Sequence, residues 1–243
     1  MVIELMKAHA SVRDYKEKQL SKEEVHELVE AAQHAASSHF VQAYSIVWVT
    51  DPEKRQKLGE LSRNPQQMEG AGAVFLMCAD YNRLKHAGEM NGEDIVFDQA
   101  ENLIVAVTDV GLLAQNLALA AESKGYGICY VGGVRNNMEA ISELAGLPEG
   151  VFPVYGLTVG VPNEFHEVKP RLPVEAIVHE NNYDEAKYKE ILPAYDKTIQ
   201  AYYESRSSNQ KSATWTEQMA SFLKEPRRQD IKDVLAKKGY LFK

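Results

Sequence analysis

Cysteine is scarce in this chain: its 243 residues include two, Cys78 and Cys129. Both stand in apolar, strand-like runs, "AVFLMCAD" and "GICYVGG", and no paired cysteines and histidines occur at metal-site spacing. The first residues also lack the pattern of a secretory signal. We therefore expect buried free thiols in a reducing, cytoplasmic environment and no bound metal. A disulfide or a catalytic thiolate is the alternative interpretation for either residue.

Basic residues are outnumbered, with 27 Lys and Arg against 35 Asp and Glu, and the formal net charge is −8. Nucleic acids and anionic membrane surfaces are therefore poor general partners, and a bound anion must be met by a local cluster of donors. The most hydrophobic stretch, residues 103–122, contains Asp109, Gln115 and Asn116, which would be expensive in lipid. It predicts a central helix of a soluble fold, buried on nearly all sides, and no membrane span.

Strand and helix patterns alternate along the whole chain, which indicates an α/β-type arrangement. Ser21-Lys-Glu-Glu24 is a capping box, and apolar residues follow it at helical spacing. The polar segment 81–98 predicts an exposed excursion. Strands are predicted at 44–51, 73–80, 128–132 and 154–162, and helices at 52–62, about 99–125, 137–147, 188–206 and from 215 onward. We find no repeat, low-complexity tract or linker, so a single domain is predicted.

Two short stretches combine cations with hydroxyl or proline neighbours. "KAHASVRDY" places His9, Ser11 and Arg13 within five residues, and arginine and serine both donate well to phosphate oxygens. "KPRLP" places Lys169 and Arg171 in a loop stiffened by two prolines, so that binding an anion there costs little ordering entropy. Taken alone, each stretch is equally consistent with an ordinary polar surface.

Two further stretches suit a flat ligand and a second anion. Gly132 and Gly133 follow a buried strand in "YVGGVRNN", and glycines at a strand end let a ligand approach the backbone. A turn without a ligand is the commoner interpretation, and the spacing disfavours a Rossmann dinucleotide site. "RSSNQKSATW" carries Arg206 and Lys211 in a polar loop, for which a solvated surface loop is the alternative.

In their order along the chain, these motifs resemble one family. "HxSVR", "ASS…VQAYS", "GYGICYVGGVRNN", "VGVP…KPRLP", "HEN.Y" and "YDKTI..YY..R…TW" resemble the nitroreductase superfamily, in its NADPH-preferring branch of FMN oxidoreductases, the major oxygen-insensitive nitroreductases. The resemblance extends from His9 to beyond Trp215. It implies an α+β, three-layer fold in which helices flank a mixed sheet. It also implies one nitroreductase-like domain over 1–243, with a C-terminal extension that wraps the partner of an intertwined homodimer.

The resemblance further implies one FMN per active site, held at the subunit interface. His9, Ser11 and Arg13 would contact its phosphate and ribityl chain. Lys169 and Arg171 would face the phosphate or the pyrimidine edge of the ring. The other implied contacts are the flavin-face residues Tyr130, Val131, Gly132 and Gly133, the segment residues Ser37, Ser38 and Gln42, which approach partly from the second subunit, and Gln66 or Gln67.

By the same resemblance, Arg206 would meet the 2′-phosphate of NADPH and Lys211 would supply a second basic contact. The implied reaction is ping-pong: NADPH passes hydride to flavin N5, and a nitroaromatic, a quinone or free flavin is then reduced at the same face. The chemistry would lie on FMN, so no catalytic side chain is predicted, and the sequence has no convincing Ser/His/Asp array. His9 is a candidate ligand rather than a general base.

Three other functions stay open at this point. A flavin reductase that supplies reduced FMN, with nitro reduction incidental, would use the same open flavin face. A non-enzymatic flavin-binding redox sensor would keep the FMN contacts and lose access for the nucleotide, which the presence of Arg206 and Lys211 disfavours. A phosphate-binding structural protein without flavin would be colourless.

Overall fold

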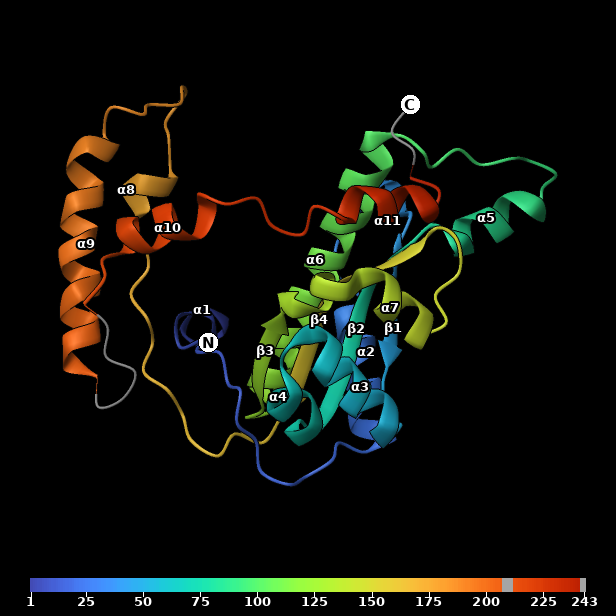
Figure 1. The fold of residues 1–243 in the computed structure, drawn as a ribbon, viewed down its shortest axis with the longest axis horizontal. Helices are drawn as coiled ribbons and strands as arrows, with labels where there is room; N and C mark the ends of the chain where they lie inside the picture. Colours follow the sequence, from blue (N-terminus) through green and yellow to red (C-terminus); the bar gives the residue numbers. More distant parts are fainter. Residues whose placement is uncertain (207–211, 241–243) are drawn as a thin grey trace. The chain divides into compact units, whose positions relative to one another are not determined.

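A computed structural model describes residues 1–206 and 212–240 of the chain, which form two compact units (Figure 1). Unit 1 comprises residues 1–166 together with the C-terminal segment from Arg228, and unit 2 comprises Glu167–Arg227. Each unit has its own hydrophobic core. The boundary at Glu167 lies just before the "KPRLP" loop.

Unit 1 is built on a sheet whose described strands follow the order β1-β2-β4-β3, with β1 at Tyr44–Trp48, β2 at Ala73–Asp80, β3 at Gly127–Val131 and β4 at Val151–Gly160. The three pairings between these strands are antiparallel. The expected mixed sheet is therefore wrong in this respect. The family resemblance implied parallel as well as antiparallel neighbours in the sheet. Here the chain reverses direction between β1 and β2 and between β3 and β4, whereas the connection through α6 leads from β2 to β3, which runs parallel to β2 and is separated from it by β4.

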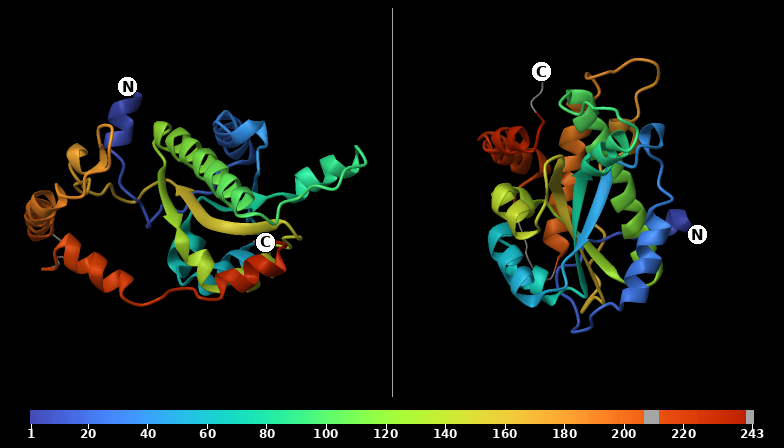
Figure 2. Two further views of the ribbon diagram at one scale, coloured as in Figure 1. Left: turned by 90° about the horizontal axis from the view of Figure 1, so that it is seen from above. Right: turned by 90° about the vertical axis from the view of Figure 1, so that its right-hand side faces the viewer.

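Helices cover both faces of the sheet and make three layers, as expected (Figure 2). One face carries α2 (Lys22–Ala32) and α6 (Ala100–Ser123), and the other carries α3 (Pro52–Ser62), α4 (Pro65–Gly70) and α7 (Met138–Leu144). The predicted capping box begins α2: the Glu24 amide donates to Ser21 Oγ at 3.1 Å, and the Ser21 amide donates to Glu24 Oε2 at 2.7 Å. Asp51 caps α3 by one such bond, which its side chain accepts from the Lys54 amide at 3.0 Å.

The position of β2 inside the sheet, between β1 and β4, explains why its sequence is continuously apolar. All eight of its residues are buried, because Phe75 and Met77 pack in the core under α6 while Leu76 and Cys78 pack in the core under α3. Cys78 is free and fully buried, and Cys129 is free and 2% exposed, which confirms the prediction of buried thiols. Burial raises the pKa of the Cys78 thiol to about 12.

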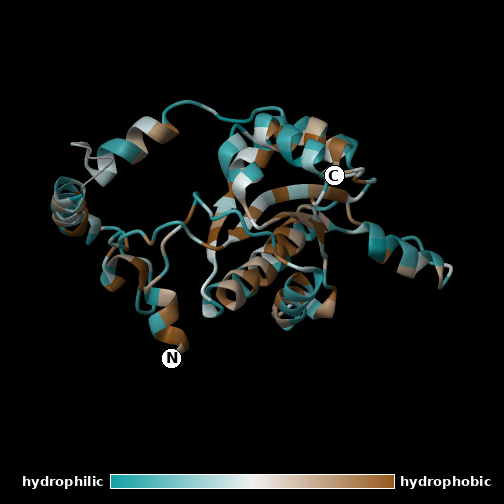
Figure 3. Ribbon diagram, turned by 90° about the horizontal axis from the view of Figure 1, so that it is seen from below, coloured by the Kyte–Doolittle hydropathy of each residue, from teal (hydrophilic) through white to brown (hydrophobic). Residues whose placement is uncertain are grey.

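The long helix α6 is buried on one side only, so the prediction of burial on nearly all sides is wrong. Its inner side packs on the sheet, whereas Ile104, Val107 and Leu112 are 61%, 38% and 41% exposed. Within the described part of the chain, α6 is the one helix long and apolar enough to cross a membrane. Of its apolar 18-residue stretch, 39% is buried inside the fold. Hydrophobic residues are also exposed on α1 (Val2–Lys7), coloured brown in Figure 3.

The remaining elements are helices: four short ones in unit 1, and the three that make up the described part of unit 2. They are η1 (Ser38–Phe40), α5 (Asn82–Glu89), η2 (Gly132–Asn137) and α11 (Ile231–Lys237) in unit 1, and α8 (Val174–Ile177), α9 (Tyr188–Ser205) and α10 (Trp215–Leu223) in unit 2. The predicted excursion at 81–98 begins with α5. Unit 2 is organised around Tyr195, Ile199 and Tyr203 of α9, against which Trp215 of α10 packs.

Candidate functional site

The glycine pair at the end of β3 lies against the last turn of α3. A Cβ on Gly133 would stand 2.2 Å from the carbonyl oxygen of Ser62 and 2.5 Å from Asn64 Nδ2, so this position needs glycine for packing. A Cβ on Gly132 would meet only the guanidinium of Arg135, at 3.2 Å. Close approach of the protein's own backbone therefore accounts for Gly133, and Gly132 is the more open of the two.

The residues before the glycines are fixed from the α6 side of the sheet. Tyr130 is half-buried, its hydroxyl donates to Gln115 Oε1 at 3.4 Å, and its ring packs edge-on against Tyr155 with 5.2 Å between centroids. Burial raises the pKa of the Tyr130 phenol. Val131 is buried. The strand end is thus a rigid platform.

A buried threonine, Thr158 of β4, joins three of the predicted segments. Its hydroxyl accepts from Gln67 Nε2 at 2.9 Å, lies 2.8 Å from the Tyr15 hydroxyl and donates to the carbonyl of Cys129 at 3.3 Å. Val12 adds a backbone bond to Ile128 of β3 at 2.9 Å. The segments around 9–15, 66–67 and 129–133 therefore lie together at the β3–β4 side of the sheet.

The side chains of the predicted glutamines and of the cluster at 9–13 differ in their exposure and in whether they already have partners within the protein. Gln67 is 6% exposed and bonded to Thr158, whereas Gln66 is exposed. His9 is 29% exposed, and its Nδ1 lies 2.5 Å from Oε1 of Glu122, at the end of α6. Ser11 is half-buried and Arg13 is exposed. Within residues 1–206 and 212–240, Arg13 forms no ion pair with a carboxylate.

The segment with Ser37, Ser38 and Gln42 is attached elsewhere, to Asp109 on α6. Asp109 is fully buried and accepts from the Ser37 hydroxyl at 2.6 Å, the Ser38 amide at 3.1 Å and the Ala43 amide at 3.2 Å. The Ser37 oxygen in turn accepts from the Gln42 amide at 2.7 Å. In this conformation the hydroxyl hydrogen of Ser37 is directed into the protein.

Three residues of this segment have left-handed backbone conformations: φ is 47° at His39, 59° at Phe40 and 50° at Gln42. Each costs about 1–2 kcal/mol for a residue other than glycine. Hydrogen bonds to a charged acceptor contribute about 1.5–3 kcal/mol each. The three bonds to Asp109 are thus large enough to offset the strain.

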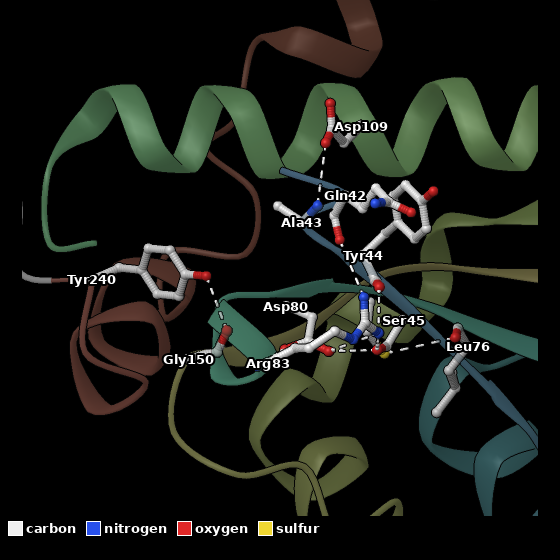
Figure 4. A network of polar contacts seen from close by, with 11 residues as sticks. Gln42, Ala43, Tyr44, Ser45, Leu76, Asp80, Arg83, Asp109, Gly150 and Tyr240 are labelled. Carbon is white, nitrogen blue, oxygen red and sulfur yellow. Dashed lines mark hydrogen bonds and ion pairs between the residues drawn. The ribbon is translucent and has the colours of Figure 1, made fainter. Parts of the chain in front are cut away.

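Arg83 braces the start of β1 next to this segment. Its guanidinium donates to the carbonyls of Gln42 at 3.2 Å and Tyr44 at 3.0 Å, and to Ser45 Oγ at 2.8 Å (Figure 4). A cleft of about 420 Å³ lies beside it, between α2, β1 and α6. The buried Tyr44 hydroxyl at this cleft has no hydrogen-bond partner within the described residues.

In unit 2, two tyrosines of α9 fix the "KPRLP" loop. Lys169 Nζ donates to the Tyr203 hydroxyl at 2.9 Å, and the Tyr195 hydroxyl donates to the carbonyl of Pro170 at 2.9 Å. Arg171 is exposed and donates to the Lys169 carbonyl. Neither cation forms an ion pair with a carboxylate in the part of the chain that the structure describes.

The predicted nucleotide residues lie at and beyond the end of α9. Arg206 directly follows α9, and its guanidinium lies 5.7 Å from the ring centroid of Tyr202. Lys211 lies outside the described residues. Across the described ranges, no group of three or more His, Cys, Asp or Glu side chains is arranged to hold a metal ion.

Comparison with known families follows the division into two units. Residues 6–161 match the model of the nitroreductase family, and residues 169–243 match the model of the nitroreductase family C-terminal domain. The chain belongs to the nitroreductase family. Membership confirms the resemblance of the ordered motifs, and the α+β fold is confirmed with it.

Relatives within the nitroreductase family cover the whole chain. It is 60% identical over 243 residues to a "CR(VI) reductase" of Pseudomonas sp. (strain G-1), covering 100% of both chains. It is 39% identical over 242 residues to the "FMN reductase (NADPH)" of Bacillus subtilis (strain 168), covering 98% of this chain and 97% of the other.

Solved structures of nitroreductase relatives have the same fold over the same length. NfrA1 of B. megaterium superposes with a TM-score of 0.95 at 42% identity, covering 99% of each chain. The NADPH:FMN oxidoreductase from Vibrio harveyi, solved in complex with NAD+, superposes with a TM-score of 0.90 at 36% identity, covering 100% of this chain and 99% of the other.

Proposed function

We propose that the protein is an FMN-dependent NADPH oxidoreductase that reduces nitroaromatics, quinones or free flavin. The observation that carries this proposal is the full-length similarity to relatives named as NADPH-linked flavin reductases, on a chain that retains the motifs predicted to hold the flavin. When bound, FMN supplies the ring that accepts hydride from NADPH and passes electrons to the acceptor, so that donor and acceptor bind in turn.

The donor set of this chain suits FMN. Arg13, Lys169 and Arg171 pair with no carboxylate within the described residues, although the protein carries a net charge of −8. Unpaired guanidinium and ammonium groups are the donors that a phosphate needs. Gly132 leaves its backbone open to a flat ring.

The protein's own residues bind and orient the cofactor. His9, Ser11 and Arg13 bind the ribityl phosphate, with the His9 ring held by Glu122. Gln66 is the better candidate of the glutamine pair, because the Gln67 amide is already bonded to Thr158. Lys169 or Arg171 favours the reduced ring by bringing positive charge to the edge where negative charge develops. Arg206 binds the 2′-phosphate of NADPH.

We propose a homodimer in which the loop containing Ser38 and Gln42 approaches the flavin of the partner. Asp109, which anchors this loop, and Glu122, which holds His9, are thirteen residues apart on α6, or about 20 Å along a helix. Groups that far apart do not both reach the phosphate end of one flavin. The exposed apolar side of α6 is suited to burial against a second copy. Unit 2 is the extension that wraps the partner.

The dimer has a direct test in solution. Size-exclusion chromatography with light scattering is expected to give twice the subunit mass of 27.2 kDa. A monomeric mass at micromolar concentration would contradict the shared site while leaving the oxidoreductase proposal in place. The two buried thiols support a cytoplasmic location, which we also propose.

Chromate is a further candidate acceptor, because the 60% identical relative is named a Cr(VI) reductase. Steady-state turnover with NADPH and, in turn, free FMN, a quinone, a nitroaromatic and chromate separates the acceptors. Parallel-line kinetics with at least one of them are expected. If free FMN is turned over far faster than the others, the flavin reductase alternative is correct. A protein that holds FMN and whose flavin NADPH does not reduce would be the redox sensor.

A further inference from the structure

The loop that contains Ser38 and Gln42 depends on one buried side chain. Asp109 is 0% exposed, and its two carboxylate oxygens accept three hydrogen bonds from the loop: two from Ser37 and Ala43 on Oδ2 and one from Ser38 on Oδ1. No cation forms an ion pair with Asp109 within the described residues. The loop therefore supplies the hydrogen bonds that water would otherwise give the carboxylate, and the carboxylate satisfies three hydrogen-bond donors of the loop.

The same contacts impose the loop's unusual backbone. His39, Phe40 and Gln42 are all left-handed, a conformation that persists only where the surroundings determine it. Ser37 connects both ends, because its hydroxyl donates to Asp109 and accepts from the amide of Gln42. Asp109 itself is held on α6, a helix of 24 residues that packs on the sheet. The anchor is rigid and the loop is strained.

We propose that Asp109 is a positioning residue of the flavin site, which acts by holding the loop so that Ser38 and Gln42 are presented to the cofactor. This inference rests on the proposed function, because it needs the loop to touch bound FMN. Asp109 contacts no ligand itself. A purely structural carboxylate would change the stability of the fold and leave the properties of the bound flavin as they are.

Asp109→Asn is the informative change because it is nearly isosteric. Whichever way the new amide turns, its NH₂ faces an N–H or O–H donor of the loop, so at least one of the three bonds is lost. We expect the FMN dissociation constant to rise about tenfold, which corresponds to ~1.4 kcal/mol. The visible circular dichroism of the bound flavin is expected to change, and amide exchange in the peptide covering 37–43 is expected to accelerate.

Ser142→Ala is the matched control for lost stability. Ser142 is 2% exposed on α7 and donates to the Met138 carbonyl at 2.8 Å, and neither residue is assigned to the site. It should lower the unfolding temperature and leave the dissociation constant and the flavin dichroism at wild-type values. If Asp109→Asn does not fold, Ser37→Ala removes the same bridge from the loop side.

The outcomes separate this inference from the proposed function. FMN binding is first measured on the wild-type protein with FMN itself; if it takes up none, the proposed function is wrong and this inference falls with it. If the wild type binds FMN and Asp109→Asn binds it equally well with the same dichroism, Asp109 is structural and only the inference is overturned. An equal loss in Ser142→Ala would also overturn it, because the effect would then follow stability.

Discussion

Gly132 and Gly133 are adjacent, and the structure assigns them opposite tolerances for a methyl group. In Gly133→Ala the new Cβ would stand 2.2 Å from the Ser62 carbonyl oxygen, which belongs to the backbone of the last turn of α3. In Gly132→Ala it would stand 3.2 Å from the end of the Arg135 side chain, which donates to the Val154 carbonyl and yields more readily than backbone does. Neither glycine has a left-handed φ, so the contrast is one of packing.

The expected magnitudes follow from these distances. Overpacking against atoms that do not yield costs about 1–3 kcal/mol and sometimes more. In a chain of this size, 1 kcal/mol lowers the unfolding temperature by about 2–4 °C. We therefore expect Gly133→Ala to unfold about 2–12 °C below wild type, with Gly132→Ala within about 2 °C of it.

Thermal unfolding followed by far-ultraviolet circular dichroism, without FMN and with saturating FMN, is the assay. Bound ligand stabilises only the folded state, so the gain in unfolding temperature on adding FMN reports binding separately. Gly132→Ala is expected to lose part of that gain, because its methyl group presses on the Arg135 guanidinium at the strand end where the flavin is proposed to bind. Equal unfolding temperatures for the two variants, or a Gly133→Ala protein as stable as wild type, would refute the packing argument.

Other predictions concern the cations and the buried acids. Arg206→Ala should raise the KM for NADPH about tenfold, the loss of roughly one charge-assisted hydrogen bond, and leave NADH unchanged; an equal effect on both nucleotides removes the 2′-phosphate contact. Arg171→Ala should lose FMN on gel filtration, and full flavin content with normal reduction kinetics would take Arg171 out of the site. Burial raises the pKa of both Cys78 and Tyr155 to about 12. The stability they contribute is therefore complete below their ordinary values, 9.0 and 10.0, and is lost as pH rises toward 12. The urea midpoint should fall from about pH 9 upward, and less so in Cys78→Ala; a midpoint that stays level to about pH 11 contradicts this.

Local patterns in the sequence predicted the regular elements well. The apolar run 73–80, the capping box at Ser21 and the proline that begins α3 each have a physical cause within a few residues, and each element lies where predicted. Strand direction has no such local signal, and the mixed sheet that the family resemblance implied is wrong for the described strands. The exposed side of α6 was missed because an apolar helix face looks the same in sequence whether it packs on its own sheet or is left bare.

The site was predictable only in part, because its supporting contacts are long-range. Asp109 and Ser37 are 72 residues apart, Gln67 and Thr158 are 91 apart, and His9 and Glu122 are 113 apart. Motifs identified candidate ligands such as His9, and no motif identified the residue that holds each one. A carboxylate in the apolar middle of a helix was the available signal for Asp109, and it does not tell which segment bonds to it.

The central claim is that the protein carries FMN and that NADPH reduces it. The most direct measurement is the visible spectrum of the purified protein during anaerobic titration with NADPH and, separately, with NADH. We predict a yellow protein whose flavin absorbance is bleached rapidly by NADPH and slowly by NADH. A colourless protein that also fails to take up added FMN would contradict the claim.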